Sequence, residues 1–406
     1  MKQTFRANAL RALTLAAAAV AASSAHAVAN FNNVGYVQYG DAQSYSLPFN
    51  VIDYCAGVNN GDCQFYVPSS PGQINDAIVI ATSPAGIASN GAGFDDAYDT
   101  PNGPQNPGPG SETIRFQTSP STARTDDGTI ANNDENTWDA RLDTLKTFLA
   151  GLAPVFYFNN NQTKSSGTSA ETLAAWMQVR VIGPDGNPVQ YTDASGTHDA
   201  IFDLTNHNSK YANVVEGGGG TIFGDVTTYT STGAGPIAGD NDHTDYVLAG
   251  GALCRDQFKL LVSCSNPSAV EGPVDHNLGA NQAVYAEIFP ELNGVLAGLF
   301  ARSALPNSDP DHVNLADYTM KVDLRLGCDS SITGNANIEA ICMADPHWRA
   351  LNNGYEQLFL SKAIFGGCTP EDTRPECHPV PEPGILSLLG LSVTGLALLR
   401  RRSKKA

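Results

Sequence analysis

The sequence predicts a mainly β protein, a jelly-roll-like β-sandwich with one inserted amphipathic helix, between an N-terminal signal peptide and a C-terminal transmembrane helix. Three observations predict the β fold. Turn-forming residues are abundant, with 39 Gly and 24 Pro in 406 residues. Short runs of β-branched and aromatic residues recur between these turns, and only one stretch has clear helical spacing. The hydrophobic share of 42% suffices for a folded core.

Expected strands follow one another along the chain, and most are bounded by turn-forming residues. Gly183–Asn187 has strong turn chemistry and predicts a hairpin between the strands on either side of it. Residues 318–326 alternate strictly between apolar and polar types, which predicts a strand with one buried and one solvated face. The expected strands are 34–39, 45–49, 64–67, 77–81, 155–158, 173–182, 188–191, 226–229, 246–253, 282–289, 318–326 and 355–361.

One amphipathic helix is predicted, because five large apolar residues recur at spacings of three and four. Asn136 or Thr137 would cap its start, and Gly151 with Pro154 would end it. We expect this face to pack on a sheet. The residues of the stripe are Trp138, Leu142, Leu145, Leu149 and Leu152.

Residues 83–111 lack a periodic pattern and end in a segment rich in Pro, Gly and Asn. They form either a long surface excursion or a joint between two subdomains. We favour the excursion, since strand patterns resume beyond it without a change in composition.

The N-terminus has the three parts of a secretory signal peptide. Lys2, Arg6 and Arg11 precede a short apolar segment, and the small residues Ala25 and Ala27 flank His26. This pattern predicts export by the Sec machinery, with cleavage after Ala27. The alternative is an anchor that is retained.

The C-terminus predicts a membrane-spanning helix over residues 384–399, which carry no charge. As a helix they would extend about 24 Å, at the short edge of what crosses a bilayer. Five basic residues follow between Arg400 and Lys405, which places this end in the cytoplasm. The alternative, a short core helix, would show a polar face, and this segment does not.

The order Val380-Pro381-Glu382-Pro383-Gly384, apolar helix, arginine cluster resembles a PEP-CTERM sorting signal. The resemblance covers about the last 25 residues. It implies export by a Gram-negative bacterium, processing at Pro381, Glu382 and Pro383 by the membrane enzyme exosortase, and a link to exopolysaccharide and biofilm. It implies an address and not an activity.

Four parts of the chain follow: a signal peptide (1–27), a β-rich ectodomain (28–364), a Pro-rich stalk (365–383) and the transmembrane helix with its basic tail (384–406). Removing residues 1–27 and 382–406 takes eight basic groups and one acid from the 23 and 41 of the whole chain. The remaining 15 basic and 40 acidic groups give a net charge of −25. Such a surface repels nucleic acids and anionic membranes.

The eight cysteines form four close pairs along the chain, which predicts disulfides in an exported protein. Neighbour pairing is the simplest of the 105 arrangements that eight cysteines allow. A zinc site is the competing interpretation, but no C-x-x-C pair is present. The pairs are Cys55 and Cys63, Cys254 and Cys264, Cys328 and Cys342, and Cys368 and Cys377.

Catalytic templates are absent from the sequence, which leans against an enzyme without deciding the question. Two weaker features point to ligands. The carboxylates of Asp240 and Asp242, and of Asp309 and Asp311, stand two apart and could converge on calcium. The amides of Asn159, Asn160, Asn161 and Gln162 follow an aromatic strand and could bind sugar hydroxyls, although such residues also serve turns.

The leading hypothesis is an exported, non-enzymatic protein of the cell surface or extracellular matrix, first anchored in the inner membrane, with exosortase, the Sec machinery and exopolysaccharide as partners. The alternative is a carbohydrate-binding or glycoside-processing surface protein. A third possibility is a purely structural matrix component.

Overall fold

The computed structural model describes residues 29–31, 36–48, 69–70, 73–74, 77–83, 89–101, 116–119, 122–159, 173–204, 212–215, 229–231, 247–249, 253–255, 257, 261–263, 267–274, 283–326 and 355–365. All of them belong to one compact unit, residues 28–367, which is described here by itself. The expected signal peptide, transmembrane helix, strand 64–67 and nearly all of the stalk lie outside the described residues.

Within the described residues, no helix is both long enough and apolar enough to cross a bilayer. The predicted span, residues 384–399, is not among them.

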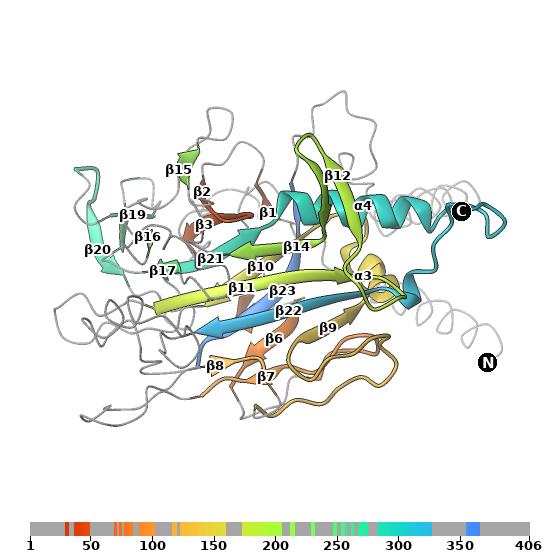
Figure 1. Ribbon diagram of the computed structural model, residues 1–406. Helices are drawn as coiled ribbons and strands as arrows, with labels where there is room; N and C mark the ends of the chain where they lie inside the picture. The colour runs from red at the N-terminus through yellow and green to blue at the C-terminus, as the bar shows by residue number, and fades with distance from the viewer. Residues whose placement is uncertain are drawn as a thin grey trace, which may run out of the picture. The chain divides into compact units, whose positions relative to one another are not determined.

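The described part of the chain is mainly β, as the sequence predicts, and most strands belong to two sheets (Figure 1). The larger has nine strands in the order β15-β2-β3-β21-β10-β23-β6-β7, with β1 paired to β23. Their bounds are β1 Ala29–Asn30, β2 Tyr36–Tyr39, β3 Ala42–Pro48, β6 Ile78–Thr82, β7 Tyr98–Asp99, β10 Ala153–Asn159, β15 Ala212–Val215, β21 Ala283–Ile288 and β23 Gln357–Ile364.

The second sheet has seven described strands in the order β16-β17-β11-β22-β8, with β14 beside β11 and β9 beside β22. The long antiparallel pair β11 and β22 runs across the front of Figure 1. The bounds are β8 Phe116–Gln117, β9 Trp138–Arg141, β11 Leu173–Ile182, β14 Ile201–Leu204, β16 Tyr229–Ser231, β17 Val247–Ala249 and β22 Thr319–Leu326.

Three small sheets complete the described strands. They are the hairpin β12–β13 (Gln190–Asp193 and Gly196–Asp199), the trio β18, β19 and β20 (Leu253–Arg255, Leu261–Ser263 and Glu271–Val274), and the pair β4–β5 (Ser69–Ser70 and Gln73–Ile74).

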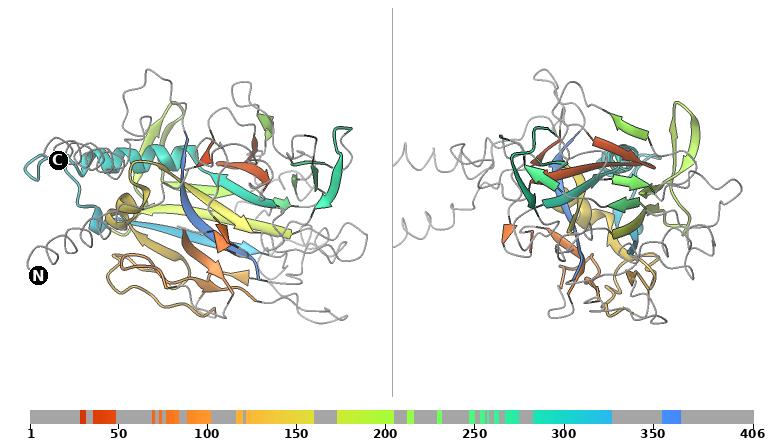
Figure 2. Two further views of the ribbon diagram at one scale, coloured as in Figure 1. Left: turned by 180° about the vertical axis from the view of Figure 1, so that it is seen from behind. Right: turned by 90° about the vertical axis from the view of Figure 1, so that its left-hand side faces the viewer.

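The two large sheets share one hydrophobic core. Phe156 and Phe158 of β10 belong to the same buried cluster as Val179 of β11 and Val322 of β22. The left view of Figure 2 shows the molecule from behind, with β23, which lies between β10 and β6 in the nine-stranded sheet, in blue. Alternate residues of its central strands, such as Tyr157, belong to a second buried cluster on its other face. The nine-stranded sheet is therefore buried on both faces at its centre.

The predicted helix is present as α3 (Leu142–Leu149), but it starts later than expected. Trp138 lies in β9, whose residues pair with β22, so neither Asn136 nor Thr137 caps the helix. Trp138 shares the core side with Leu142 only because a strand residue and a helix residue happen to point the same way. The helix ends where the sequence predicts, because Ala150 and Gly151 adopt positive φ values of 52° and 89°.

A second helix, α4 (Pro290–Arg302), is not predicted by the sequence analysis above. Pro290 starts it, and Leu292, Val295, Leu296 and Leu299 form its buried face at helical spacing. Two glycines within the helix, at 294 and 298, weaken helix propensity and hide this pattern.

The hairpin expected around Gly183–Asn187 is only partly correct. The chain does turn there, with the Gly183 N–H donating to the Asn187 carbonyl at 2.8 Å. However, only a single bridge follows, between Ile182 and Pro188. Instead, β11 pairs with β14, and the chain between them forms the separate hairpin β12–β13.

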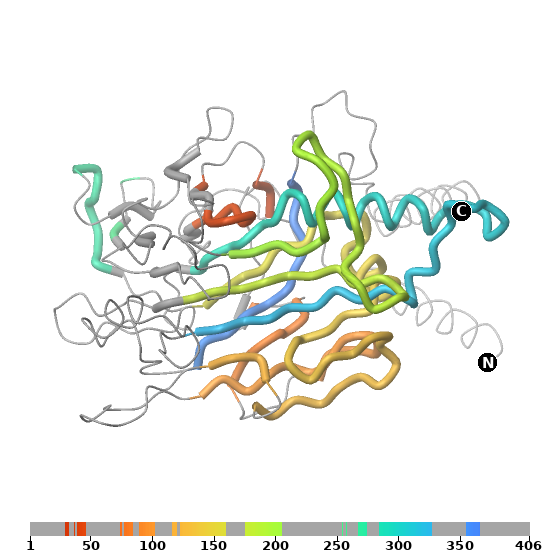
Figure 3. Tube along the Cα trace, viewed as in Figure 1, coloured from red at the N-terminus to blue at the C-terminus, as the bar shows by residue number. Residues whose placement is uncertain are grey.

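Two further expectations are wrong for a common reason. The outward residues Thr319 and Lys321 of β22 are 0% and 5% exposed, so this half of the strand has no wet face. Likewise, the excursion at 83–111 is not a surface loop over residues 93–98, most of which are buried. In the lower part of Figure 3 the trace of residues 89–101 and 122–137 lies beside β9 and β22. These segments cover β22 and contact the ammonium group of Lys321.

Candidate functional site

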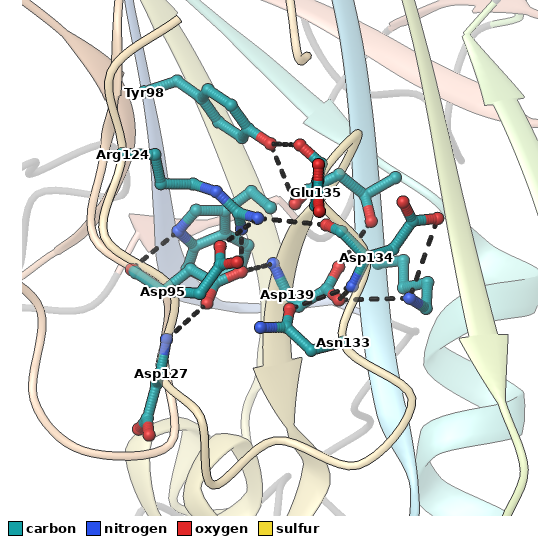
Figure 4. Close-up of polar contacts among 12 residues, drawn as sticks. Asp95, Tyr98, Arg124, Asp127, Asn133, Asp134, Glu135 and Asp139 are labelled. Carbon is teal, nitrogen blue, oxygen red and sulfur yellow. Dashed lines mark hydrogen bonds and ion pairs between the residues drawn. The ribbon is translucent and has the colours of Figure 1, made fainter. Parts of the chain in front are cut away.

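Four charged side chains meet beneath the segments that cover β9 and β22 (Figure 4). Asp95 pairs with Arg124, and Asp139 pairs with Lys321. We call these four residues the buried charge cluster. The side chains of Asp95 and Asp139 are 0% exposed, and those of Arg124 and Lys321 are 3% and 6% exposed.

The Asp95 carboxylate is held by three donors. Besides the Arg124 guanidinium, it accepts the backbone N–H of Asp127 at 2.9 Å and that of Asp139 at 2.8 Å. The Asp95 carbonyl accepts the indole N–H of Trp138 at 2.9 Å. One residue therefore joins the segment after β6, the loop before β9, and β9 itself.

The Asp139 carboxylate is held in the same way. It accepts the Thr137 hydroxyl at 2.6 Å, the Asp134 backbone N–H at 2.8 Å and the Lys321 ammonium at 3.1 Å. Lys321 also donates to the backbone carbonyl of Asn132. This second half of the cluster fixes the loop over β22.

Arg124 is held on every side. Its second amino group donates to the Asp134 carbonyl at 3.0 Å and pairs with Asp126, while its Cζ lies 4.7 Å from the centroid of the Tyr98 ring. A planar guanidinium suits such a site, because it can donate in two directions and stack on an aromatic face. Tyr98 in turn donates its hydroxyl to the Glu135 carbonyl at 2.7 Å.

The backbone at Gly93 makes this arrangement possible. Its φ is +88°, and a Cβ there would lie 2.2 Å from Thr144 Oγ1. Its N–H donates to the Asp127 carboxylate, and its carbonyl accepts the Arg141 N–H at 2.8 Å. A glycine is therefore needed for this segment to run beside β9.

Burial governs the protonation of both acids. It raises the pKa of Asp95 to about 7, although Arg124 and the backbone N–H of Asp127 favour the ionised form. It raises the pKa of Asp139 to about 6, against the influence of Lys321 and the Thr137 hydroxyl. Both acids are therefore harder to ionise than exposed carboxyls, despite their cations.

The hydrogen bonds that the two carboxylates already accept limit the reactions in which the cluster could take part. Each carboxylate already accepts three hydrogen bonds from the protein, and neither is exposed to solvent. A general acid or base must reach a substrate proton within hydrogen-bond distance. The cluster instead attaches the irregular segments around Asp95 and Asp134 to the paired strands β9 and β22, so its role is structural.

A second buried acid lies in the nine-stranded sheet. Glu287 of β21 accepts the hydroxyl of Ser44, its cross-strand neighbour on β3. Burial raises the pKa of Glu287 to about 8, and only the Ser44 hydroxyl opposes this shift. Glu287 is therefore largely protonated at pH 7.

The expected ligand residues have mixed outcomes. Asn159 ends β10 and is 2% exposed, with its amide donating to Gln357 Oε1 at 3.0 Å, so it does not face a ligand. Asn160, Asn161 and Gln162 lie outside the described residues.

The two expected calcium pairs also have different outcomes. Asp240 and Asp242 are not among the described residues. The Asp309 carboxylate accepts the backbone N–H of Asp311 at 2.9 Å, as in a capped turn. In the described ranges, no group of three or more His, Cys, Asp or Glu residues is placed to hold a metal ion.

Of the eight cysteines, only Cys254 is described, and it is disulfide-bonded. Its predicted pairing with Cys264, and the other three pairs, stay predictions.

A serine, a histidine and an aspartate meet on the exposed hairpin β12–β13. His198 Nε2 lies 2.8 Å from Ser195 Oγ and 3.3 Å from Asp193 Oδ1. In a catalytic triad the two ring nitrogens contact different partners, whereas here one nitrogen contacts both. The Ser195 hydroxyl also donates to Asp193 directly, at 2.7 Å. This group closes a turn.

Sequence reasoning missed the buried charge cluster. Its members are up to 226 positions apart, from Asp95 to Lys321, and they meet only in the folded chain. No distinct signal marked it in the sequence, because Lys321 is one of three charged residues, with Asp323 and Arg325, at the alternate positions of β22. The acid itself cannot be chosen among 41 from sequence alone.

A family described as a domain of unknown function, DUF8239, matches residues 28–325 of the chain. This match covers more than half of the sequence, so the chain belongs to that family. No curated protein and no solved structure matches it.

Proposed function

We propose that this member of the DUF8239 family is a non-enzymatic protein of the cell surface or extracellular matrix. It is exported by a Gram-negative bacterium, sorted by exosortase, and linked to exopolysaccharide. Its ectodomain is a jelly-roll-like β-sandwich, carried on a stalk until the C-terminal helix is removed. The signals at the two ends of the sequence support the address, and the disulfide at Cys254 agrees with an oxidising compartment.

The proposal that the protein is non-enzymatic rests on the buried charge cluster, whose carboxylates are saturated with hydrogen bonds from the protein. The cluster's four charged side chains pair with one another, and its two acids are sealed from solvent. Perturbed acids in an open cleft would favour catalysis. Here the same shifts come from groups that hold the fold together.

Intact mass of the native protein tests the address. The protein is isolated from membrane and medium fractions and measured with and without reduction. We expect a chain that starts at Val28 and ends near Pro381, and that gains eight hydrogens on reduction. A full-length C-terminus retained in the membrane would show that the tail is a plain anchor, and the link to biofilm would then be withdrawn.

Incubation of the purified protein with matrix polysaccharides tests the non-enzymatic part separately. We expect the polymers to keep their length distribution in size-exclusion chromatography. Depolymerisation with turnover would establish the carbohydrate-active alternative instead.

A further inference from the structure

We propose that Lys321 and Asp139 become joined by an isopeptide bond, an amide between their two side chains. The bond makes a permanent link between β22 and β9 inside the buried charge cluster. This inference goes beyond the proposed function and does not depend on it, because it concerns a reaction between two side chains of the folded chain itself.

The strand register brings the two side chains together. Lys321 of β22 is the direct cross-strand partner of Asp139 of β9, so both side chains lie on the same face of the sheet. Lys321 Nζ lies 3.1 Å from Asp139 Oδ2, although the two residues are 182 positions apart in the chain. A reaction between groups held side by side in this way needs no diffusion and little further ordering.

The fold excludes water from both reacting groups. The side chains of Asp139 and Lys321 are 0% and 6% exposed. An ammonium and a carboxylate lose their hydration when they are buried, whereas an amide carries no charge and loses much less. The exclusion of water also protects the product, because hydrolysis of an amide requires water at its carbonyl carbon.

The hydrogen-bond partners around the pair suit an amide. The Asp139 carboxylate accepts the Thr137 hydroxyl at 2.6 Å and the Asp134 backbone N–H at 2.8 Å. An amide carbonyl oxygen has two lone pairs and can accept from the same donors. Lys321 donates to the Asn132 carbonyl, which can accept the single N–H that remains after the bond forms. The amide therefore has partners on both sides.

The reaction requires no cofactor and no oxidant. One hydrogen of the Lys321 ammonium passes along the hydrogen bond to the Asp139 carboxylate, which gives an amine beside a carboxylic acid. The amine nitrogen attacks Cγ, a second hydrogen moves to one carboxyl oxygen, and that oxygen leaves as water. A C–N bond forms, a C–O bond breaks, and the third hydrogen stays on the amide nitrogen.

Asp134 offers a route for the second hydrogen and for the water. Its Oδ2 lies 3.9 Å from Lys321 Nζ, and its side chain is 37% exposed. After a small movement, or through one water molecule, this carboxylate can take a proton from the attacking nitrogen and return it to the leaving oxygen. Until the bond forms, Lys321 and Asp139 are the ion pair described above, and the raised pKa of Asp139 belongs to that state.

Mass spectrometry of the native protein, after reduction of its disulfides, tests the bond. The loss of one water molecule lowers the mass of the chain by about 18 Da. Trypsin does not cleave after an acylated lysine, so it leaves residues 303–325 attached to residues 125–141. We expect this branched peptide in place of the free peptide that ends at Lys321.

Three variants separate the bond from other losses of water. Lys321→Arg keeps the positive charge but has no amine, so we expect the free peptide 125–141 and no loss of mass. Lys362→Arg is the matched control, because Lys362 is partly buried and donates to the Phe148 carbonyl at 3.3 Å, and it should keep the branched peptide. Asp139→Asn would release ammonia instead of water, which changes the loss to about 17 Da.

Two outcomes overturn the inference. Recovery of the wild-type peptides 125–141 and 303–321 unlinked and at full mass would show an ordinary ion pair. A loss of one water in Lys321→Arg as well as in the wild type would place the dehydration elsewhere, as in a cyclised aspartate. Neither outcome affects the proposed function, because these peptides are separate from the two ends whose processing the intact mass measures.

Discussion

Two regions of this protein hold buried acids with different partners. Asp95 and Asp139 are paired with Arg124 and Lys321, whereas Glu287 has the Ser44 hydroxyl and is raised furthest in pKa. Ser44 and Glu287 are already cross-strand neighbours in a continuous ladder. Asp139 and Lys321 are also cross-strand neighbours, on β9 and β22, but both paired acids additionally accept a backbone N–H from the irregular segment before β9. Cations are thus buried with the acids that hold irregular backbone, and a neutral acid suffices where its partner is a side chain of the next strand.

Removing a cation from the cluster should have the largest effect. Arg124→Met leaves Asp95 buried without its partner, and we expect the free energy of unfolding to fall by about 3–5 kcal/mol at pH 8. The loss should shrink at pH 5, because Asp95 can then take up a proton instead. Urea unfolding at both pH values measures this. A loss that is independent of pH would mean that Arg124 acts by packing on Tyr98.

Gly93→Ala tests the backbone that shapes the same region. The new Cβ would approach Thr144 Oγ1 within 2.2 Å at a φ of +88°, and we expect a loss of about 1–3 kcal/mol. Gly298→Ala on α4 is the matched control, since its Cβ would meet open space and alanine favours a helix by roughly 0.5–1 kcal/mol. Equal effects of the two changes would contradict a special role for Gly93.

The pH dependence of stability separates the two regions. The ordinary pKa values are 3.8 for Asp and 4.5 for Glu, and the pKa values of Asp95, Asp139 and Glu287 are raised above them. The folded protein therefore keeps protons that the unfolded chain releases, and stability falls as pH rises, by about 1.4 kcal/mol per pH unit for each group.

Glu287→Gln should flatten this fall between pH 7 and 8, where Glu287 still titrates in the folded protein. Asp95→Asn should flatten it at lower pH, between about 4 and 7. Chemical denaturation across this range measures both slopes. An unchanged slope from pH 7 to 8 in Glu287→Gln would show that Glu287 is ionised in the folded protein.

Deleting single hydroxyl donors should give the smallest effects. Thr137→Val removes a donor to Asp139 and should cost about 1.5–3 kcal/mol if that acid is charged. Ser44→Ala removes a donor to the protonated Glu287 and should cost only about 0.5–1.5 kcal/mol. Parallel urea titrations at pH 8 compare the two variants. A larger loss in Ser44→Ala would reverse the assignment of charge.

The strands could largely be predicted because β-branched runs and turn residues are local signals. The pairing of Asp95 with Arg124, and of Asp139 with Lys321, could not, since it depends on contacts between distant segments. For the same reason the alternation in β22 gave the correct core face but not the burial of Lys321. Trp138 was assigned to a helix because a spacing of four also fits the step from strand to helix.

The hairpin β12–β13 has a practical consequence for the cell biology of this protein. Its strands pair with each other, its turn residues from Asp193 to Ser195 are exposed, and Tyr191 packs on Phe202 at its base. Exposed turns of this kind tolerate insertions. A short epitope placed after Ser195 would therefore leave both sheets intact. Antibody labelling of unbroken cells would then show directly whether, and when in growth, the protein reaches the outside.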